Sequence, residues 1–384
     1  MNLSPNRLAT ISLVTTLLLF APLVPAAEII IPSPDSNSRM SVENVVFGGN
    51  GATVFFLTWP DLGDPNSGKS CGINYYRVAL NRSGGSSGAE PVARGVCTGL
   101  IQKSRLLDNG DALIIATRQV ERWRGGERVE SLPFTGLDRA SRQGIVLDLG
   151  GPGNIGISGA GHVVAAMQSS PAEIIVSAMS PNGKSAWRSN ITAESQNASV
   201  RQVVAGSEGG ALVIVEQIAL SGSGMSLYSF SPSGEVHRQD LVSSDGALTP
   251  EAMGDMSPQE MQAAFERMSS ANPLEIARIS ARDRPGGGYD VLFVQNGGDT
   301  SAEGAYLLRL DNSGRELNKV FLGRLLQEQS IGEWAEFRVA GDTLLVQGKV
   351  LASQPSVQAR RKKYGQNVLS IYDIRSGALD SRLV

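Results

Sequence analysis

One pattern occurs six times in this sequence and constrains its fold more than any other feature. A small glycine-containing turn is followed, after one or two residues, by four mainly apolar residues that suit a strand buried on both faces. Successive runs start 59, 50, 49, 79 and 53 residues apart, and a period near 50 with one insertion is typical of propeller blades. The runs are Val54–Leu57, Leu113–Ala116, Val163–Ala166, Leu212–Val215, Val291–Val294 and Leu344–Gln347, and the turns contain Gly51, Gly110, Gly161, Gly210, Gly288 and Gly341.

A second glycine turn lies later in most repeats, after a strand with alternating apolar and polar residues such as Met225–Phe230. Each repeat therefore predicts four strands, a to d in chain order, with short a–b and c–d turns. We expect an all-β fold, a β-propeller of about six four-stranded antiparallel blades. Stacked sandwiches or a solenoid are the alternatives. The second turns are Asn182-Gly183, Ser233-Gly234, Ser313-Gly314 and Ser376-Gly377.

The longest spacing between repeats predicts a helical insertion at about residues 243–273, between blades 4 and 5. Ser257 can cap a helix there, Pro258 fits its first turn, and Glu260 completes a capping box. The methionines around this helix could ligate Cu(I), but packing over the rim of the blades explains them better.

Two segments resemble the quinoprotein-type (PQQ-like) propeller repeat in their strand, turn glycine and following strand. They are residues 179–187, Met-Ser-Pro-Asn-Gly-Lys-Ser-Ala-Trp, and residues 371–377, Ile-Tyr-Asp-Ile-Arg-Ser-Gly. The resemblance extends loosely over residues 42–384 and implies a propeller. It does not extend to a quinoprotein dehydrogenase, because the adjacent cysteine pair of those enzymes is absent and the tryptophans occupy different positions in their repeats. The tryptophans are Trp59, Trp123, Trp187 and Trp334.

Residues 1–26 read as a secretory signal peptide. Arg7 supplies a positive charge, residues 11–23 are largely apolar, and Val24-Pro25-Ala26 suits cleavage before Ala27. Thr15, Thr16 and two prolines interrupt a stretch already shorter than the roughly 20 apolar residues of a membrane span. We therefore expect a propeller domain at 27–384, periplasmic or secreted, with no transmembrane segment.

The two cysteines, Cys71 and Cys97, are equidistant from Gly84, which lies in a glycine- and serine-rich stretch. Two residues equidistant from a hairpin tip face each other across antiparallel strands. We therefore predict that strands c and d of the first repeat pair around this tip and that a disulfide joins Cys71 to Cys97, as export permits. Two buried thiols are the alternative.

The net charge of −3 argues against nucleic acid as a partner. Basic side chains cluster in two segments between strands b and c of their repeats: Arg122 and Arg124 with neighbouring arginines, and the run Arg360, Arg361, Lys362 and Lys363. In a propeller these segments and the d–a links share one face, which is here rich in loops and hence the functional candidate. A protein or an anionic glycan would be its partner. Solvated charges that keep the hairpins soluble are the alternative.

Few residues suit catalysis, and the sequence predicts no catalytic residue, metal site or cofactor. The only histidines, His162 and His237, lie before a buried strand and just after a c–d turn. Residues 63–70 match the Gly-x4-Gly-Lys-Ser spacing of a phosphate-binding loop, and residues 84–88 match Gly-x-Ser-x-Gly. In the predicted all-β repeats neither stretch lies between a strand and a helix, which a phosphate-binding loop or a nucleophile elbow requires. We therefore expect an exported, non-catalytic binding or scaffold propeller that acts through its loop-rich face. The alternative is a hydrolase or lyase with carboxylates on the same face.

Overall fold

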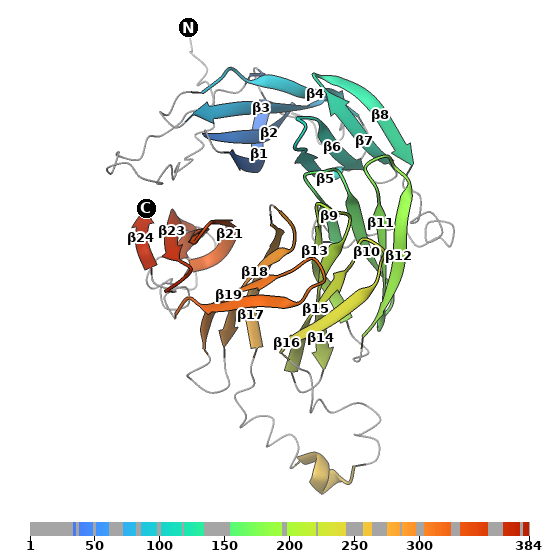
Figure 1. Cartoon of the computed structure of the whole chain (residues 1–384), viewed down its shortest axis with the longest axis vertical. Helices are drawn as coiled ribbons and strands as arrows, with labels where there is room; N and C mark the ends of the chain where they lie inside the picture. The colour runs from blue at the N-terminus through green and yellow to red at the C-terminus, as the bar shows by residue number, and fades with distance from the viewer. Residues whose placement is uncertain are drawn as a thin grey trace. The chain divides into compact units, whose positions relative to one another are not determined.

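Over the residues that it describes, the computed structural model has 24 strands in six four-stranded antiparallel sheets (Figure 1). It describes residues 34–35, 38–48, 51–60, 72–81, 86–97, 101–116, 119–133, 154–193, 198–219, 222–242, 256–262, 275–284, 286–296, 303–323, 331–351, 364–376 and 379–383. The predicted signal peptide, 1–26, lies outside these residues. Among the described residues, no helix has the length and apolar character needed to cross a membrane.

Each sheet uses four consecutive strands in chain order, so each is one propeller blade, numbered here along the chain. Blade 1 has β1 Ser38–Gly48, β2 Gly51–Pro60, β3 Ile73–Asn81 and β4 Glu90–Val96; blade 2 has β5 Ile101–Leu106, β6 Ala112–Ala116, β7 Gln119–Arg124 and β8 Glu127–Pro133. Blade 3 has β9 Ile155–Ile157, β10 Val163–Ser170, β11 Glu173–Met179 and β12 Ser185–Thr192; blade 4 has β13 Ala198–Ala205, β14 Ala211–Ala219, β15 Gly222–Phe230 and β16 Val236–Val242. Blade 5 has β17 Glu275–Asp283, β18 Tyr289–Asn296, β19 Gly304–Leu310 and β20 Glu316–Phe321; blade 6 has β21 Ile331–Ala340, β22 Thr343–Leu351, β23 Tyr364–Asp373 and β24 Leu379–Leu383.

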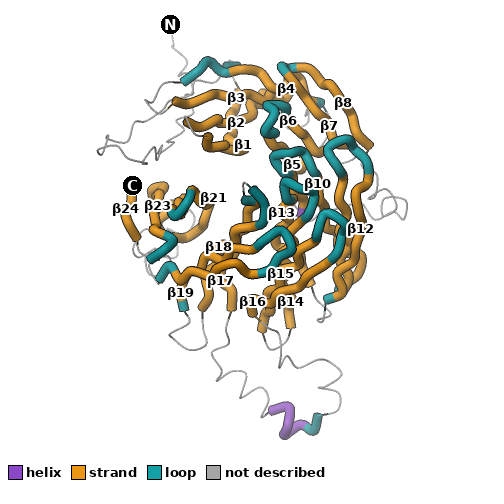
Figure 2. The backbone as a smooth tube through the Cα atoms, in the orientation of Figure 1, coloured by secondary structure: helices purple, strands orange, loops and turns teal. Residues whose placement is uncertain are grey.

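The expected six-bladed β-propeller is therefore confirmed. All six apolar runs fall on the second strand of a blade, β2, β6, β10, β14, β18 and β22. The tube drawing in Figure 2 shows the same predominance of strand over helix among the described residues. Within a blade, the a–b and c–d turns lie at one end of the strands, which we call the turn edge. The b–c connections lie at the other end, the loop edge.

Four of the predicted a–b turn glycines, Gly110, Gly161, Gly288 and Gly341, adopt the left-handed conformation expected for tight hairpins, and the a–b turn of blade 4 differs from the prediction. In the a–b turn of blade 4, Gly209 has the positive φ of 92°, and Gly210 does not. Gly210 is needed for another reason: a Cβ there would lie 2.6 Å from the carbonyl oxygen of Phe230. The turn therefore uses both glycines, one for conformation and one for close approach.

The first strand of most blades carries a β-bulge that the sequence patterns did not reveal. The register with the second strand shifts between Val42 and Asn44, Ile101 and Lys103, Val200 and Gln202, and Ile276 and Arg278. Blade 6 has two such shifts. Because a bulge bends a strand and increases its twist, its recurrence gives the first strands of these blades a similar curvature.

The chain forms two compact units, and the apolar core of each lies between neighbouring blades. Blades 1 and 2 belong to the first unit, together with Gly159–Gly161 and Pro181–Gly183; the rest of blades 3 to 6 belongs to the second. In the first unit Phe55 and Tyr75 of blade 1 pack against Ile114 of blade 2. In the second, separate clusters join blades 3 and 4, 4 and 5, and 5 and 6. Burial between blades therefore explains why the b strands are apolar on both faces.

The predicted capping box is present at the start of the short helix, residues 258–262. The Ser257 amide donates to Glu260 Oε2 at 2.8 Å, and the Glu260 amide donates to Ser257 Oγ at 3.3 Å. Hydrogen bonds from Ser257 lower the pKa of Glu260. The insertion's remaining residues, 243–255 and 263–273, lie outside the described residues.

Candidate functional site

Arg122 and Arg124 lie on strand β7 of blade 2, and the sequence-based placement of these residues in a b–c loop was wrong. Residues 119–133 form a c–d hairpin, because Gly125 and Gly126 adopt positive φ angles of 57° and 98° and reverse the chain in two residues. Arg124 ends β7 beside this turn. Both arginines therefore approach the turn edge of the blade and not its loop edge.

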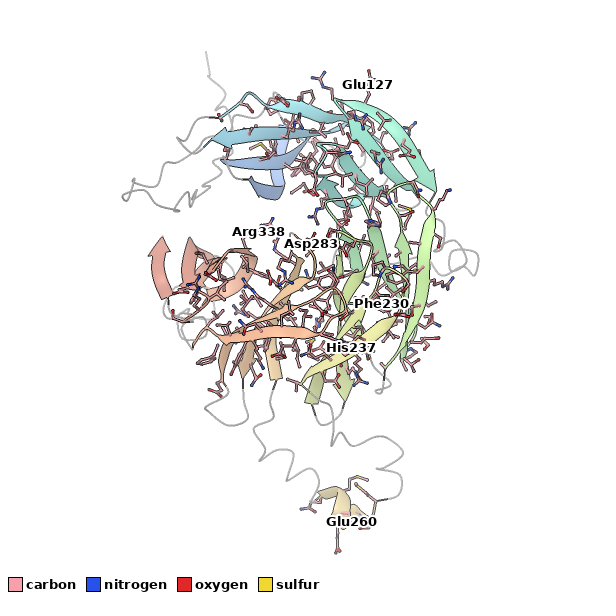
Figure 3. All side chains as sticks on the ribbon, viewed as in Figure 1. Glu127, Phe230, His237, Glu260, Asp283 and Arg338 are labelled. Carbon is pink, nitrogen blue, oxygen red and sulfur yellow. The ribbon has the colours of Figure 1, made fainter. Side chains whose placement is uncertain are left out.

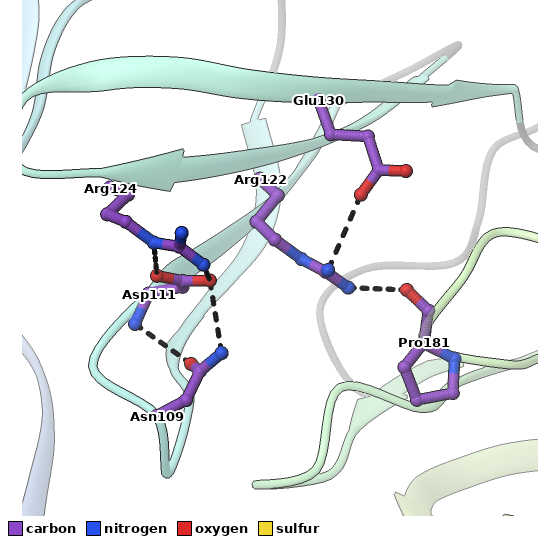
Figure 4. A network of polar contacts seen from close by, with 6 residues as sticks. All are labelled: Asn109, Asp111, Arg122, Arg124, Glu130 and Pro181. Carbon is purple, nitrogen blue, oxygen red and sulfur yellow. Dashed lines mark hydrogen bonds and ion pairs between the residues drawn. The ribbon is translucent and has the colours of Figure 1, made fainter.

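Arg124 clamps the two turns of blade 2 together through Asp111. Its Nε and Nη2 donate to Asp111 Oδ1 and Oδ2 at 2.7 and 2.8 Å, a bidentate arrangement (Figure 4). Asn109, in the a–b turn, donates from Nδ2 to Asp111 Oδ2 at 3.1 Å. The hydrogen bonds from Arg124 outweigh burial and lower the pKa of Asp111. The carboxylate is 2% exposed while the guanidinium is 65% exposed, so the arginine covers a buried anion.

Arg122 points along the same edge toward a different pair of partners. Its guanidinium pairs with Glu130 of β8 at 3.4 Å and donates to the Pro181 carbonyl oxygen in the 181–183 turn (Figure 4). A carbonyl and a carboxylate thus share one cation. Arg122 consequently joins the blade 2 hairpin to another turn of the first unit.

The same hairpin contains a third carboxylate, Glu121, whose side chain is fully buried. Trp123 Nε1 donates to Glu121 Oε2, and Arg128 Nη1 donates to Glu121 Oε1, each at 2.9 Å. Arginines 122, 124 and 128 are thereby matched by Glu130, Asp111 and Glu121. Positive and negative charges therefore balance at this hairpin. These ion pairs are better explained as contacts that hold the hairpin in place than as a cationic surface for a partner.

Blade 6 repeats part of this arrangement in the second unit. Asp342 follows the turn glycine Gly341 as Asp111 follows Gly110, and it forms an ion pair with Arg375 just after β23. A sequence signal for the clamp therefore existed: Gly-Asp in the a–b turn, with arginine where strand c meets the c–d turn. Sequence reasoning missed Asp111, Glu121 and Asp342 because it considered each charge run alone.

The other predicted site residues divide between described and undescribed segments. Arg360, Arg361, Lys362, Lys363 and Cys71 lie outside the described residues, and their proposed roles stay predictions. Cys97 is exposed and follows β4 directly. The predicted pairing of strands c and d in blade 1 is confirmed, and Ile73 lies opposite Val96. The disulfide itself stays a prediction.

Both histidines have the strand positions expected from the sequence. His162 is half-buried before β10, its ring lies against Gly209, and burial lowers its pKa. His237 is exposed on β16 (Figure 3). Within the described part of the chain, no three His, Cys, Asp or Glu side chains form a group that could hold a metal ion.

The four tryptophans occupy four different strand positions, as expected. They lie on strand b of blade 1, strand c of blade 2, strand d of blade 3 and strand a of blade 6. Trp187, on strand d, joins blades 3 and 4: its Nε1 donates to the Gly209 carbonyl at 2.9 Å, and its ring stacks on Phe230 with centroids 5.1 Å apart. The four tryptophans therefore do not form a repeated signature along the blades.

Comparison with known proteins gives structural neighbours only. No family model and no curated protein matches the chain. Among solved structures, the β-propeller domain of the Trilobed protease from Pyrococcus furiosus is 7% identical, with a TM-score of 0.42, covering 87% of this chain and 83% of that one. BBS1N in complex with ARL6DN is 10% identical, with a TM-score of 0.34 and coverages of 81% and 76%. A DUF4221 member from Bacteroides vulgatus is 11% identical, with a TM-score of 0.37 and coverages of 80% and 86%. These low values carry no inference about activity.

Proposed function

We propose that this protein is an exported, non-catalytic binding or scaffold propeller. The observation that carries the proposal is how the ionisable groups of blade 2 are used. Asp111, Glu121 and Glu130 each contact an arginine that ties turns or strands together. Catalysis by paired carboxylates needs one acid that keeps its proton. A bidentate arginine and a lowered pKa hold Asp111 in the ionised form.

The partner would bind at the loop edge, where the insertion and the b–c connections lie. The turn edge has short hairpins, and Asp111 in blade 2 and Asp342 in blade 6 each form an ion pair with an arginine there. Loops vary freely on a rigid scaffold, and binding residues concentrate there. Under this proposal the basic run at 360–363, which the sequence places between β22 and β23, would bind an acidic protein surface or an anionic glycan.

In vivo crosslinking followed by mass spectrometry tests this proposal. The full chain carries a photoreactive residue either beside β16 and β17 at the loop edge or in the 125–126 turn at the turn edge. We expect one recurrent partner from the loop-edge position and none from the turn-edge position. Equal yields from both positions would contradict the loop-edge site. Turnover of a polymeric substrate, lost on replacing one loop-edge acid, would replace the proposal with the hydrolase or lyase alternative.

Export and the disulfide can be tested together by intact mass. Processing should leave a chain beginning at Ala27. The hydrogen bond from the Gly72 amide to the Val96 carbonyl, at 3.2 Å, places the neighbours of both cysteines side by side and supports the Cys71–Cys97 bond. Alkylation without reductant should therefore add no mass, and alkylation after reduction should add two groups. Two groups added before reduction would rule the disulfide out. Its 27-residue loop is expected to contribute about 3–4 kcal/mol.

The quinoprotein-type repeat class is part of the same proposal. Residues 179–187 form the strand, turn and strand expected from the resemblance, with Gly183 at a positive φ of 79°. Trp187 at the end of this segment anchors blade 3 to blade 4. The use of Trp187 as a packing contact between two blades favours a scaffold role over a cofactor site.

A further inference from the structure

The segment preceding β1 makes an unusual polar contact with the face of blade 1. Asp35 lies just before the first strand, yet its carboxylate reaches side chains on β2 and β3. Thr58 Oγ1 and Asn74 Nδ2 donate to Asp35 Oδ2, the latter at 3.0 Å, and the Tyr76 hydroxyl donates to Oδ1 at 2.9 Å. Both carboxylate oxygens are therefore engaged by donors that belong to the blade.

These donors are held in place by the blade itself. Thr58 and Asn74 are directly opposite each other on β2 and β3, and Tyr76 follows Asn74 on the same face. Thr58 is fully buried, and the Tyr76 ring stacks on Phe56 with centroids 5.6 Å apart. The side-chain oxygen of Asn74, Oδ1, accepts a hydrogen bond from the Gly95 amide at 2.8 Å. This fixes the side-chain amide so that its NH₂ group points at Asp35. The arrangement is thus preorganised.

The three hydrogen-bond donors, Thr58, Asn74 and Tyr76, are arranged to bind a carboxylate group. Two donors converge on one ligand oxygen and a third on the other, so both ligand atoms must accept hydrogen bonds. Arg94 on β4 adds a positive charge that favours the ionised form. Burial raises the pKa of Asp35, but the three hydrogen bonds and Arg94 outweigh it and the pKa is lowered. A buried hydroxyl such as that of Thr58 would lose its partner if the carboxylate left.

We propose that Thr58, Asn74 and Tyr76, with Arg94 nearby, form a carboxylate-binding site on blade 1, which the chain fills with its own Asp35 as an intramolecular ligand. The ligand anchors the segment before β1, and Ser38 Oγ supports the bend by donating to the Asp35 carbonyl at 2.8 Å. The class of ligand is a single carboxylate. Removing the Asp35 side chain should therefore open the site to a small free carboxylate.

Chemical rescue tests this site in the mature chain, residues 27–384. Asp35→Ala should lower Tm and speed hydrogen exchange in residues 38–48, and sodium acetate should restore most of both losses at pH 7. Sodium chloride at equal ionic strength should not. Glu127→Ala removes an exposed acid of β8 and is the matched control, expected to show neither loss nor rescue. Equal effects of acetate and chloride on Asp35→Ala would overturn the proposal.

A double-mutant cycle keeps the proposal testable if Asp35→Ala folds poorly. Tyr76→Phe removes one hydroxyl and leaves the stack on Phe56 intact. It should speed exchange in residues 38–48 and show no response to acetate, because Asp35 still fills the site. Adding Tyr76→Phe to Asp35→Ala should cost little further Tm. Additive losses, or unchanged exchange in Tyr76→Phe, would show that Asp35 and Tyr76 do not act together.

Discussion

The c–d hairpins of blades 2 and 3 occupy the same place in their repeats but are held by different forces. In β7–β8, buried Glu121 is satisfied by Trp123 and Arg128, and Arg124 clamps Asp111. In β11–β12, Trp187 uses an aromatic stack and one hydrogen bond to a backbone carbonyl. Repetition of the blade therefore preserves the backbone, while the side-chain contacts that fasten each hairpin are chosen locally. The two hairpins should respond differently to mutation, pH and salt.

The largest effect should come from the aromatic hairpin. Trp187→Ala removes a large buried side chain from the joint between blades 3 and 4 and should cost about 3–5 kcal/mol in the free energy of unfolding. Trp187→Phe keeps a ring on Phe230 but loses the bond to Gly209, and should cost about 1–2 kcal/mol. Urea denaturation followed by circular dichroism measures both. If Trp187→Ala lowers the free energy of unfolding by less than the blade 2 variants do, the aromatic contacts are not the stronger of the two.

The buried charge of the blade 2 hairpin should give the next largest effect. Arg128→Ala leaves the Glu121 carboxylate buried without its cation and should cost about 1–3 kcal/mol. The double variant Glu121→Gln/Arg128→Ala removes the unpaired charge and should recover part of that loss. The urea midpoints of the single and the double variant measure this recovery. If the double variant is less stable than Arg128→Ala, charge pairing is not what Arg128 contributes.

The Asp111 clamp should make the charged hairpin sensitive to acid. The folded pKa of Asp111 is lowered, so its contribution is fully present above the unfolded pKa, near 3.8, and is lost as pH falls through the folded value. The stability gap between wild type and Asp111→Asn should therefore narrow as the pH falls below about 4. The gap between wild type and Trp187→Phe should stay constant over the same pH range. Urea midpoints from pH 7 to pH 3 provide the measurement.

The smallest effect on stability is expected from the basic run at the loop edge. Replacing Arg360, Arg361, Lys362 and Lys363 with Ser should change Tm little, because exposed charges contribute about 0–1 kcal/mol each. Binding to an anionic partner should weaken and lose its salt dependence. Heparin-column elution provides a first measurement, with Glu127→Ala as the control. Unchanged elution would assign these charges to solubility alone.

Much of the fold could be predicted, because it depends on local chemistry that recurs. Buried b strands need apolar residues, and tight turns need glycine at positive φ, so both signals repeat with every blade. The capping box at Ser257 was readable for the same reason. The placement of residues 119–130 in a b–c loop failed, since the diglycine turn at 125–126 was read as part of that loop. The sequence analysis compared runs of basic residues with one another. It therefore did not consider carboxylates such as Asp111 and Glu121, which pair with the arginines in the fold.

The sequence by itself determined six blades, their strand order, the pairing of strands c and d in blade 1 and the short capped helix. These features follow from the period of apolar residues and the identity of turn residues within a few positions. Tertiary structure alone decided that Arg124 covers Asp111, that Trp187 reaches Gly209, and that Asp35 meets Thr58 and Tyr76. Such contacts join residues 13, 22, 23 and 41 positions apart, and no local pattern encodes which distant donor meets which acceptor. Packing the blades against one another selects these partners, because a buried polar group must find one.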